Sequence, residues 1–580
     1  MSRTDDISAR WSRLMNRLEA RRAAWSKPAT AFLSQPEPRT IGSFARGRQL
    51  SAGNFVFAGT LIQAPHTRLW DLAAPDSEFC AEQHGFGWLD DLAAAGDAPA
   101  RAAAQEWLAD WIARYGDGSG PGWTPELTGR RLIRWITHAL FLMSGQGNEI
   151  AEGFMRSLAQ QTIFLSRRWK SSSPGLPRFE ALTGMLYAGL SLEGMEAHVK
   201  PALSALAREC DSQIDSQGGL PTRNPEELLE VFTLLTWAAL ALSETGHTPS
   251  NAHWGAIERI APTLRTLRHA DGGLARFHGG GRGLEGRLDS ALATSGVKSS
   301  APDGVSMGFA RLSAGRTSVI VDAAPPPRGR ASANAHASTL AFELTSGRRS
   351  LIVNCGSGAS FGPDWRRAGR ATPSHSTLIL SSRSSSRLGA SGESLQWLED
   401  TPTEVPTEIS QAQDGIRFEG GHNGYKRGYG LTHIRKLDMT FDGRGIAGED
   451  TLMTLDNADR TAFDAALDRA RLQGVPYDIR FHLHPDVDAS VDMGGTAVSL
   501  ALKSGEIWIF RLDGAAEMRL DASVYLEKLR LKPRATKQIV LSGNVMQYAA
   551  RVRWSLAKAQ ETPVSIRDLA QEEVDPLAVD

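Results

Sequence analysis

Clustered arginines and tryptophans are the side chains in this sequence that could hold an anionic sugar. Arg130, Arg131 and Arg134 fall within one short segment, and guanidinium groups donate paired hydrogen bonds to carboxylates. Because 64 Lys and Arg are matched by 65 Asp and Glu, any anionic ligand must be held by a local basic cleft. Tryptophan faces can stack against sugar rings, and the candidates are Trp88, Trp123 and Trp135. The alternatives are arginines that only cover a helix face and tryptophans that fill the core.

Glu227 and Tyr425 are the candidate bases. A glutamate can abstract a proton when burial raises its pKa. Glu227 also follows a proline at the start of a predicted helix, where the helix dipole favours carboxylates, so a structural role is the alternative. Tyr425 ends the segment HNGY, which begins at His422, and a turn role for this glycine-bearing segment competes with a catalytic one.

The pair His482 and His484 is spaced for one face of a strand, because alternate residues of a strand point the same way. Such a pair could bind a metal, and packing is the alternative. The cysteines are an odd, sparse set, which argues against a disulfide framework: Cys80, Cys210 and Cys355.

The first half of the chain has the apolar spacing of helices. From about residue 85 to 300, apolar residues recur three and four positions apart, as in AAAQEWLADWIARY and PEELLEVFTLLTWAALAL. Glycine- and proline-rich breaks separate these segments. Two breaks, SQGGLPTR and ADGGLARF, are alike and lie about 54 residues apart, the length of a helical hairpin with its turns. A repeated hairpin predicts an α-solenoid or a closed α/α toroid.

The sequence pattern of the second half of the chain predicts strands. After about residue 300 come short segments rich in β-branched and aromatic residues, among them TSVIVDAA, STLAFELTS, RSLIVNCG, EIWIFRLDG and KQIVLSG. Many such segments without a long helical pattern predict antiparallel sheets packed as a sandwich. The predicted division is an amphipathic extension at 1–50, a toroid at 51–300, a sandwich at 301–565 and an acidic tail at 566–580.

Composition narrows the classes of partner. A chain that is 41% hydrophobic and 22% charged is typical of a globular protein, and 580 residues exceed one ordinary core. Balanced charge predicts no nucleic-acid partner. No stretch reaches the ~20 apolar residues of a membrane helix, which predicts no membrane insertion. The N-terminus lacks an apolar signal region, which predicts a cytoplasmic protein, and a homodimer remains an open expectation.

Two segments carry a family resemblance. ANAHASTLAFELTSGRRSLIVNCGSG, followed by WRRAGRATPSHSTLIL, resembles the β-sandwich signature of the heparinase II/III family. EGGHNGYKRGYGLTHIRKLDMTFDG looks like a further segment of that family, and QHGFGWLDDL and LRHADGGLARFHGGG look like its toroid segments. The resemblance spans roughly residues 50–560. It implies a multidomain α and β protein, an incomplete (α/α) toroid followed by an antiparallel β-sandwich.

The resemblance also implies a metal site. In that family two histidines and an aspartate hold zinc, and by register these positions are His336, Asn354 and His375. Two are imidazoles, which zinc prefers, but the third is an amide, a weak zinc ligand. The alternative is that both histidines are core imidazoles bonded to the backbone.

The activity that the resemblance implies is β-elimination at a uronic acid. A base removes the C5 proton, a donor neutralises the neighbouring carboxylate, and the glycosidic oxygen leaves C4. The toroid departs from the family pattern at these positions. Glu227 stands where the family has its base tyrosine, and Leu176 and Pro177 stand where it has Asn-His; Arg223 is kept.

Three functions therefore remain open. The first is a polysaccharide lyase with a rearranged site, in which Glu227 or Tyr425 is the base, assisted by His422, and Arg223 or Asn334 meets the carboxylate. The second is an inactive protein that binds an acidic glycan or cell-wall fragment through the arginines and tryptophans named above, with Arg370 added. The third is a glycoside hydrolase that pairs Glu227 with another carboxylate such as Glu180 or Asp271.

The expected partner is an acidic oligo- or polysaccharide. Glycan-degrading members of the family are typically periplasmic, so the resemblance and the N-terminus point to different compartments. A cytoplasmic protein would favour small oligosaccharides as substrates.

Overall fold

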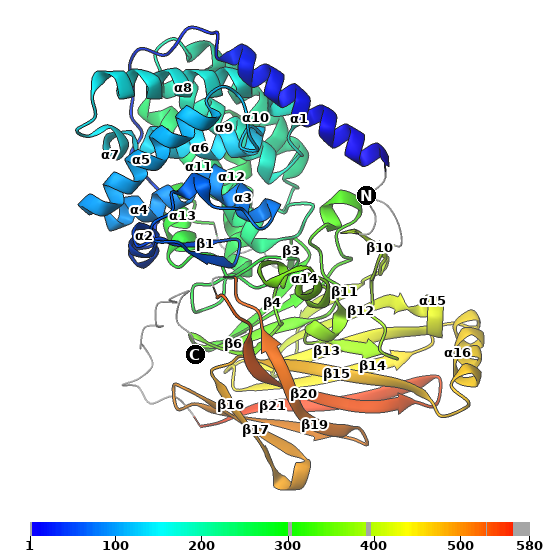
Figure 1. Cartoon of the computed structure of the whole chain (residues 1–580). Coiled ribbons are helices and arrows are strands. Elements are labelled where there is room, and N and C mark those ends of the chain that lie inside the picture. The colour runs from blue at the N-terminus through cyan, green and yellow to red at the C-terminus, as the bar shows by residue number, and fades with distance from the viewer. Residues whose placement is uncertain (1–2, 300–303, 390–395, 529, 561–580) are drawn as a thin grey trace. The chain divides into compact units, whose positions relative to one another are not determined.

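The protein has a helical N-terminal part and a C-terminal part of antiparallel sheets (Figure 1). This computed structural model describes residues 3–299, 304–389, 396–528 and 530–560. The predicted fold class, an incomplete (α/α) toroid followed by an antiparallel β-sandwich, is confirmed. None of the described helices is both long and apolar enough to cross a membrane.

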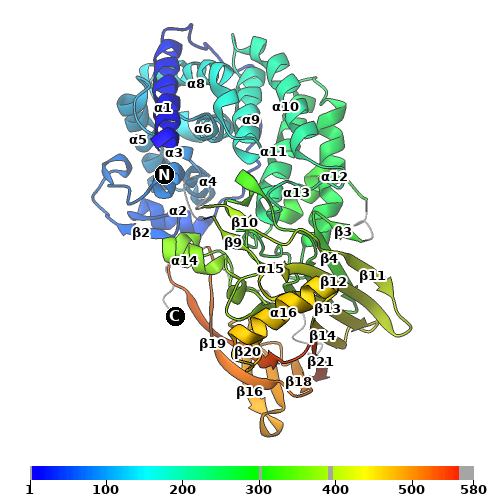
Figure 2. The same ribbon diagram turned by 90° about the vertical axis from the view of Figure 1, so that its right-hand side faces the viewer.

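The toroid is built from helices joined by glycine- and proline-rich turns. Figure 2 shows α8, α9, α10 and α12 succeeding one another along a curved array. The helices of this part are α1 Arg3–Ala23, α2 Phe44–Ser51, α3 Ser77–Gly85, α4 Trp88–Ala95, α5 Ala98–Tyr115, α6 Pro125–Thr137, α7 Ala139–Met143, α8 Asn148–Arg168, α9 Leu176–Ser191, α10 Val199–Gln213, α11 Pro225–Glu244, α12 Asn251–Leu267 and α13 Arg287–Ser295.

Helices α6 and α9 contact each other through their backbones. A Cβ atom on Gly129 would lie 2.2 Å from the Glu180 carbonyl oxygen, and one on Gly184 would lie 2.5 Å from the Gly129 Cα. Only glycine permits this approach. The close packing brings the side chains of Arg130 and Glu180 together.

The two similar sequence breaks form similar turns. Gly218 follows α10 with φ +78°, and Gly272 follows α12 with φ +87°. Each donates its backbone N–H to the carbonyl three residues earlier, on Asp215 and His269 respectively. A left-handed glycine in the turn after α10, and again in the turn after α12, is the repeated feature detected in the sequence.

The sandwich consists of two antiparallel sheets. One has the strand order β11-β12-β13-β14-β21-β18-β17-β16 and the other β19-β20-β15-β7-β6-β5-β4-β3, with β8 paired to β15. The strands are β3 Val305–Ser306, β4 Phe309–Ala314, β5 Thr317–Asp322, β6 Phe342–Ser346, β7 Arg349–Val353, β8 Leu378–Leu380, β11 Thr407–Gln411, β12 Gly415–Tyr425, β13 Leu431–Thr440, β14 Gly445–Met453, β15 Val475–Leu483, β16 Val487–Asp492, β17 Ala497–Leu502, β18 Ile507–Asp513, β19 Glu517–Tyr525, β20 Arg534–Val545 and β21 Ala549–Gln560.

Aromatic rings fill the space between the two sheets. Trp554 of β21 stacks on Phe510 and Phe342 at centroid distances of 5.7 and 6.0 Å and meets the edge of Phe481 at 4.8 Å. Phe342 and Phe481 come from one sheet, and Phe510 and Trp554 from the other. Burial of each such ring contributes roughly 1.5–3 kcal/mol, so this cluster joins the sheets into one core.

The boundary between the two parts differs from the predicted cut at residue 300. Residues 219–228 and 262–288 belong with the sandwich, and 229–261 and 289–298 belong with the helices. Arg223 explains part of this difference, because its guanidinium donates to the backbone carbonyls of Met307 and Gly308 at 3.0 and 2.6 Å. The predicted acidic tail at 566–580 lies outside the described residues.

Candidate functional site

Arg130 and Glu180 form a polar pair inside the toroid. The Arg130 Nε donates to the Glu180 carboxylate at 2.5 Å, and the Arg130 side chain is 34% exposed. Burial raises the pKa of the Glu180 carboxyl although Arg130 opposes the shift. One Glu180 oxygen, Oε2, is buried without a hydrogen-bond partner. Glu180 therefore already neutralises part of the positive charge of Arg130. The predicted ligand-binding role of Arg130 remains a prediction.

Arg134 is paired with a buried aspartate. Its Nε donates to Asp90 at 3.0 Å, and the other Asp90 oxygen lies 3.0 Å from the His138 ring. Burial opposes the Asp90 anion, but Arg134 and His138 outweigh burial and lower its pKa. The Arg134 guanidinium is thus held by the protein, which leaves it poorly placed to bind a free carboxylate.

Arg131 is engaged inside the core, which disfavours its predicted role in ligand binding. The side chain is fully buried, with its guanidinium 4.1 Å above the Trp111 ring. Its nitrogens donate to the Gln161 side chain at 2.7 Å and to the carbonyls of His84 and Gly122 at 3.0 and 3.1 Å. Arg131 joins helices within the core.

The predicted tryptophan platforms are core residues. Trp88, Trp123 and Trp135 are 3%, 3% and 0% exposed, so no sugar ring can stack on them. They pack among aromatic rings, as Trp88 does on Phe86 at a centroid distance of 4.6 Å. The prediction of stacking faces is wrong for these three, because helical spacing placed them on the inward side of α4 and α6 or in the turn between helices.

Arg223 is held in the sandwich by hydrogen bonds to the protein. Its Nη2 donates to the Asp322 carboxylate at 2.6 Å, and its Nη1 donates to the Ala324 and Pro325 carbonyls. Burial opposes the Asp322 anion, but Arg223 and then His278 dominate and hold its pKa well below the usual range. All three nitrogens of the guanidinium are therefore engaged with the protein.

A chain of buried imidazoles continues from Asp322. The His278 Nε2 lies 3.4 Å from Asp322, and the His278 Nδ1 accepts the backbone N–H of His336 at 3.2 Å. The His336 Nδ1 is hydrogen-bonded to the His375 Nε2 at 3.0 Å, and the His375 Nδ1 contacts the Ala371 carbonyl at 2.9 Å. The core-imidazole interpretation of His336 and His375 is thus the observed arrangement.

The residues at the implied zinc position do not fit a zinc ion. The Asn354 Oδ1 accepts the backbone N–H of Ser376 at 3.0 Å. His336 and His375 are bonded to each other, and an amide replaces the anionic third ligand. Within the described ranges, no group of three His, Cys, Asp or Glu side chains is arranged to hold a metal. Two imidazoles and an amide lack the negative charge that a structural zinc site ordinarily supplies.

Tyr425 and His422 are buried in the sandwich core. The Tyr425 hydroxyl donates to the Leu378 carbonyl at 2.8 Å, and burial strongly raises the pKa of the phenol. The His422 ring is hydrogen-bonded to His433 at 3.2 Å and accepts the Gly424 N–H at 3.1 Å. With exposures of 2% and 1%, both side chains lie in the core and direct their hydrogen bonds to the protein, which favours a structural role over the predicted catalytic one.

The start of α11 shows the structural role that competed with catalysis. The Asn224 Oδ1 accepts the backbone N–H groups of Glu226 and Glu227 at 3.0 and 3.2 Å, which caps the helix. Glu226 accepts the N–H of Gly281 at 2.8 Å and pairs with Lys528. Glu227 has a half-buried side chain, and its role as a base remains a prediction.

Asn334 and Arg370 flank the imidazole chain. Asn334 is exposed, and its side-chain oxygen accepts a hydrogen bond from Arg366 at 2.8 Å. Arg370 is 6% exposed and donates to the Ala335 and Ser332 carbonyls, both at 2.8 Å. Burial and then Arg366 lower the pKa of Arg370 to about 10. Arg370 therefore braces a loop instead of binding a ligand, whereas Asn334 remains available.

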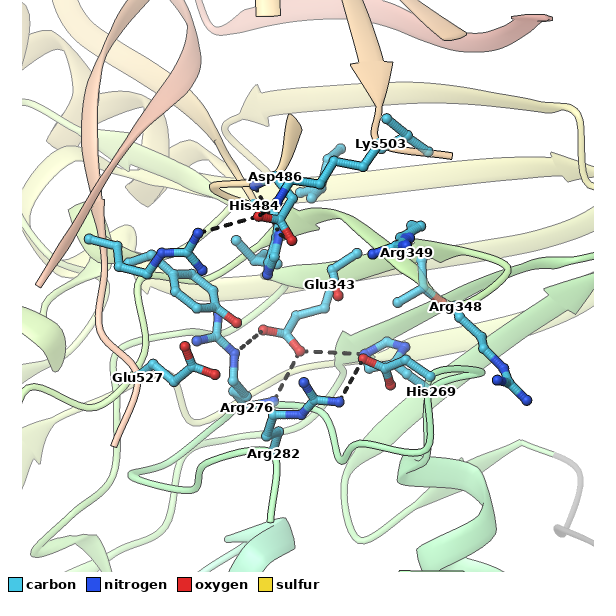
Figure 3. Close-up of a pocket in the computed structure, with 18 of the residues that line it drawn as sticks. His269, Arg276, Arg282, Glu343, Arg348, Arg349, His484, Asp486, Lys503 and Glu527 are labelled. Atoms are coloured by element: carbon cyan, nitrogen blue, oxygen red, sulfur yellow. Dashed lines mark hydrogen bonds and ion pairs between the residues drawn. The ribbon is translucent and has the colours of Figure 1, made fainter. Parts of the chain in front are cut away.

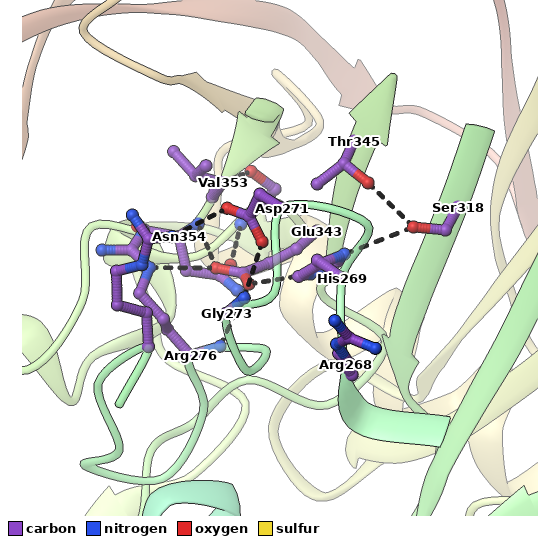
Figure 4. Close-up of polar contacts among 12 residues, drawn as sticks. Arg268, His269, Asp271, Gly273, Arg276, Ser318, Glu343, Thr345, Val353 and Asn354 are labelled. Carbon is purple, nitrogen blue, oxygen red and sulfur yellow. Dashed lines mark hydrogen bonds and ion pairs between the residues drawn. The ribbon is translucent and has the colours of Figure 1, made fainter. Parts of the chain in front are cut away.

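A polar pocket that the sequence did not reveal lies within the sandwich part (Figure 3). Its volume is about 480 Å³, and its lining includes seven Arg or Lys and four Asp or Glu side chains. Figure 4 shows its inner wall, where Glu343 is surrounded by His269, Arg276 and Asn354. The available signals were the turn pair Arg348 and Arg349 and the polar residues of ADGGLARF, which the sequence could not bring together.

This chain resembles known proteins in its C-terminal half and, for one relative, along most of its length. Residues 297–555 match the family described as heparinase II/III-like, C-terminal. FtsZ-localized protein C of Caulobacter vibrioides (strain NA1000 / CB15N) is 31% identical over 538 residues, which covers 90% of this chain and 89% of that protein.

Solved structures of polysaccharide lyases share the fold. Heparinase III has a TM-score of 0.67 at 13% identity, covering 93% of this chain and 88% of that chain. A heparan sulfate lyase mutant from Pedobacter heparinus has a TM-score of 0.58 at 16% identity, covering 96% and 90% of the two chains. These similarities agree with the sandwich signature that the sequence carries. This chain belongs to the heparinase II/III-like family.

Proposed function

We propose that this chain is a non-lytic member of its family and acts as a binding protein at FtsZ assemblies. The observation that carries the proposal is that three of the five residues predicted for elimination are engaged inside the protein. The Tyr425 hydroxyl, the His422 ring and the Arg223 guanidinium all direct their hydrogen bonds into the protein. β-Elimination requires a base that reaches C5 and a donor on the carboxylate. None of these three groups can supply either.

The place of action follows from a relative that resembles this chain along most of its length. That relative is named for its localisation with FtsZ, at 31% identity over 538 residues. The solved heparinase III and heparan sulfate lyase structures share the fold at only 13% and 16% identity. A fold hosts many functions, so similarity of sequence along the whole chain is the better guide to a shared cellular role.

A lyase acting on uronic-acid glycans is the second candidate function. It is favoured by the fold and by Glu227, which stands where the family resemblance puts a base. Asn334 would then contact the substrate carboxylate, because its side chain is exposed. The expected substrate would be an acidic oligo- or polysaccharide.

Two measurements on the purified full-length chain separate these functions. The first follows the ultraviolet absorbance of unsaturated product during incubation with heparan sulfate, hyaluronan, chondroitin and alginate oligosaccharides. The second is co-sedimentation of the chain with polymerised FtsZ from its own organism. The proposal expects no unsaturated product and pelleting that requires FtsZ polymer.

An absorbance increase that Glu227→Gln abolishes, and that exposed Glu517→Gln on β19 leaves unchanged, would establish the lyase instead. Absence of pelleting would remove the FtsZ part of the proposal. The other part of the proposal, that the chain has no lyase activity, would then depend on the absorbance assay alone.

A further inference from the structure

The polar pocket of the sandwich part has the size and charge of a small-molecule site. It lies among β6, β7, the β15–β16 turn, the β19–β20 connection and the segment 269–282 (Figure 3). A volume of about 480 Å³ falls within the range of ligand sites in proteins. Of the candidate residues named from the sequence, only Asp271 and His484 line it.

Arg276 on the inner wall keeps an unused donor. The side chain is only 6% exposed, and its guanidinium lies 4.0 Å from the centre of the Tyr525 ring. One terminal nitrogen donates to the Asn354 carbonyl, and the other, Nη1, is buried without a hydrogen-bond partner. Leaving a buried charged donor unsatisfied is expensive, so this nitrogen indicates a missing acceptor.

The Glu343 carboxylate neutralises the positive charge of Arg276. Its carboxylate accepts the backbone N–H of Arg276 at 3.0 Å and that of Asn354 at 3.3 Å, and the His269 Nε2 lies 3.4 Å away (Figure 4). Burial opposes the anion, but Arg276 and then His269 prevail and lower the pKa of Glu343. The His269 Nε2 is thereby engaged with the Glu343 carboxylate. The inner wall therefore presents one unpartnered nitrogen donor, the Arg276 Nη1, on a fixed frame.

The rim carries positive charge beyond what its acids neutralise. Arg349 of β7 is half-buried, and its side chain makes no hydrogen bond or ion pair with the residues that the structure describes. Asp271 pairs with Arg282 at 3.3 Å and also accepts the Gly273 N–H at 2.8 Å. Carboxylates that line a basic pocket can accept hydrogen bonds from hydroxyl groups.

We propose that this pocket binds a small hydroxylated anion, a sugar acid or sugar phosphate of one or two rings. The anionic group would contact Arg276 and Arg349, and the hydroxyls would donate to Asp271 and Glu343. Carboxylate and phosphate oxygens are equivalent acceptors for these guanidinium groups. The inference stands apart from localisation at FtsZ, because it requires neither elimination chemistry nor a protein partner.

The test is isothermal titration calorimetry of the full-length chain at low ionic strength. The probes are glucose 6-phosphate, glucuronate, inorganic phosphate and, as the neutral control, glucose. The variants are Arg349→Gln in the pocket and Arg553→Gln on β21, an exposed arginine outside it. Both arginines reach solvent, so neither substitution should prevent folding.

One of the two sugar anions is expected to bind more tightly than glucose and than phosphate alone. Arg349→Gln is expected to weaken that binding about 10- to 100-fold, the effect of losing one charge-assisted hydrogen bond. Arg553→Gln should leave it unchanged, and added salt should weaken it. Whichever of glucose 6-phosphate and glucuronate binds more tightly shows whether the pocket prefers a phosphate or a carboxylate.

Three results would overturn the inference. They are no heat of binding with any anionic probe, equal binding of glucose, and equal affinity in Arg349→Gln and Arg553→Gln. Phosphate binding as tight as that of glucose 6-phosphate would overturn the sugar part, because the hydroxyls would then contribute nothing.

Discussion

Burial decides the role of most candidate residues. The hydroxyl of Tyr425, the ring of His422 and the guanidinium of Arg131 are chemically able to act on a sugar, yet each is at most 2% exposed. In each case the hydrogen-bonding capacity is directed to neighbouring groups of the protein. A polar group that is satisfied inside the core stabilises the fold and has no capacity left for a ligand.

Tyr425→Phe should lower stability and leave function unchanged. Removing the hydroxyl leaves the buried Leu378 carbonyl without that donor, so the free energy of unfolding should fall by about 1–3 kcal/mol. Urea denaturation measures this change, and the proposed co-sedimentation with FtsZ polymer should match wild type. A full loss of function in a folded Tyr425→Phe protein would contradict the structural role.

The stability of the imidazole chain should depend on pH. Burial lowers the pKa of His375 to about 4 from its ordinary value of 6.5. Because the folded pKa is lowered, the unfolded chain binds more protons between these values. The stabilisation by neutral His375 is therefore complete above pH 6.5 and is lost as the pH falls towards 4.

The measurement compares wild type with His375→Gln by urea denaturation at several pH values. The difference in free energy of unfolding should shrink as the pH falls through this window. Exposed His247→Gln controls for the loss of a histidine as such. A difference that stays constant or grows on acidification would refute a buried neutral imidazole.

Chelation should leave the protein intact. The amide of Asn354 and the direct bond between His336 and His375 do not make a zinc site. Dialysis against a chelator is therefore expected to leave the melting temperature unchanged, and metal analysis should find less than one zinc per chain. Stoichiometric zinc together with a lower melting temperature after chelation would contradict this expectation.

At the scale of elements, the contact between α6 and α9 depends on glycine. A Cβ on Gly129 would meet the Glu180 backbone at 2.2 Å, and helix backbones cannot yield by that much locally. The same contact sets the Arg130 and Glu180 pair inside the toroid. Helix propensity alone would favour alanine at this position, so packing overrides it.

Gly129→Ala should destabilise the toroid strongly, by several kcal/mol, because overpacking against backbone forces the helices apart. Gly153→Ala on α8 is the matched control, since nothing lies within 4 Å of the added Cβ. That control should be neutral or stabilising by up to about 1 kcal/mol. Thermal melting measures both, and equal melting temperatures would refute the packing argument.

At the scale of the whole molecule, the chain crosses between its two compact units more than once. Residues 262–288 follow most of the toroid in sequence but belong with the sandwich. They supply Arg276 and His269 to Glu343. A cut at residue 300 would therefore leave a buried carboxylate without its cations.

A fragment 262–560 should be more stable than a fragment 301–560. Removing the partners of a buried charge costs about 3–5 kcal/mol, so the shorter fragment should melt earlier or fail to fold. Circular dichroism and dye binding to exposed apolar surface measure the difference. Equal melting of the two fragments would show that the segment 262–288 is not part of the sandwich core.

The sequence by itself determined the fold class and the family. Apolar periodicity, the repeated glycine turns and the β-branched segments are local signals, and local spacing is what distinguishes helices from strands. The sandwich signature around Phe342 and His375 was sufficient for the family. Glu227, at the position where the family resemblance implies a tyrosine, was also visible in the sequence.

Only the tertiary structure decided which side chains are available. Trp88 and Arg131 have the residue types of a sugar site, but their exposure depends on how helices pack, which spacing within one helix does not specify. The pocket around Arg276 joins residues from positions 269 to 534, and no local pattern connects them. Burial and long-range pairing arise from the packed core, so they could not be predicted from one sequence.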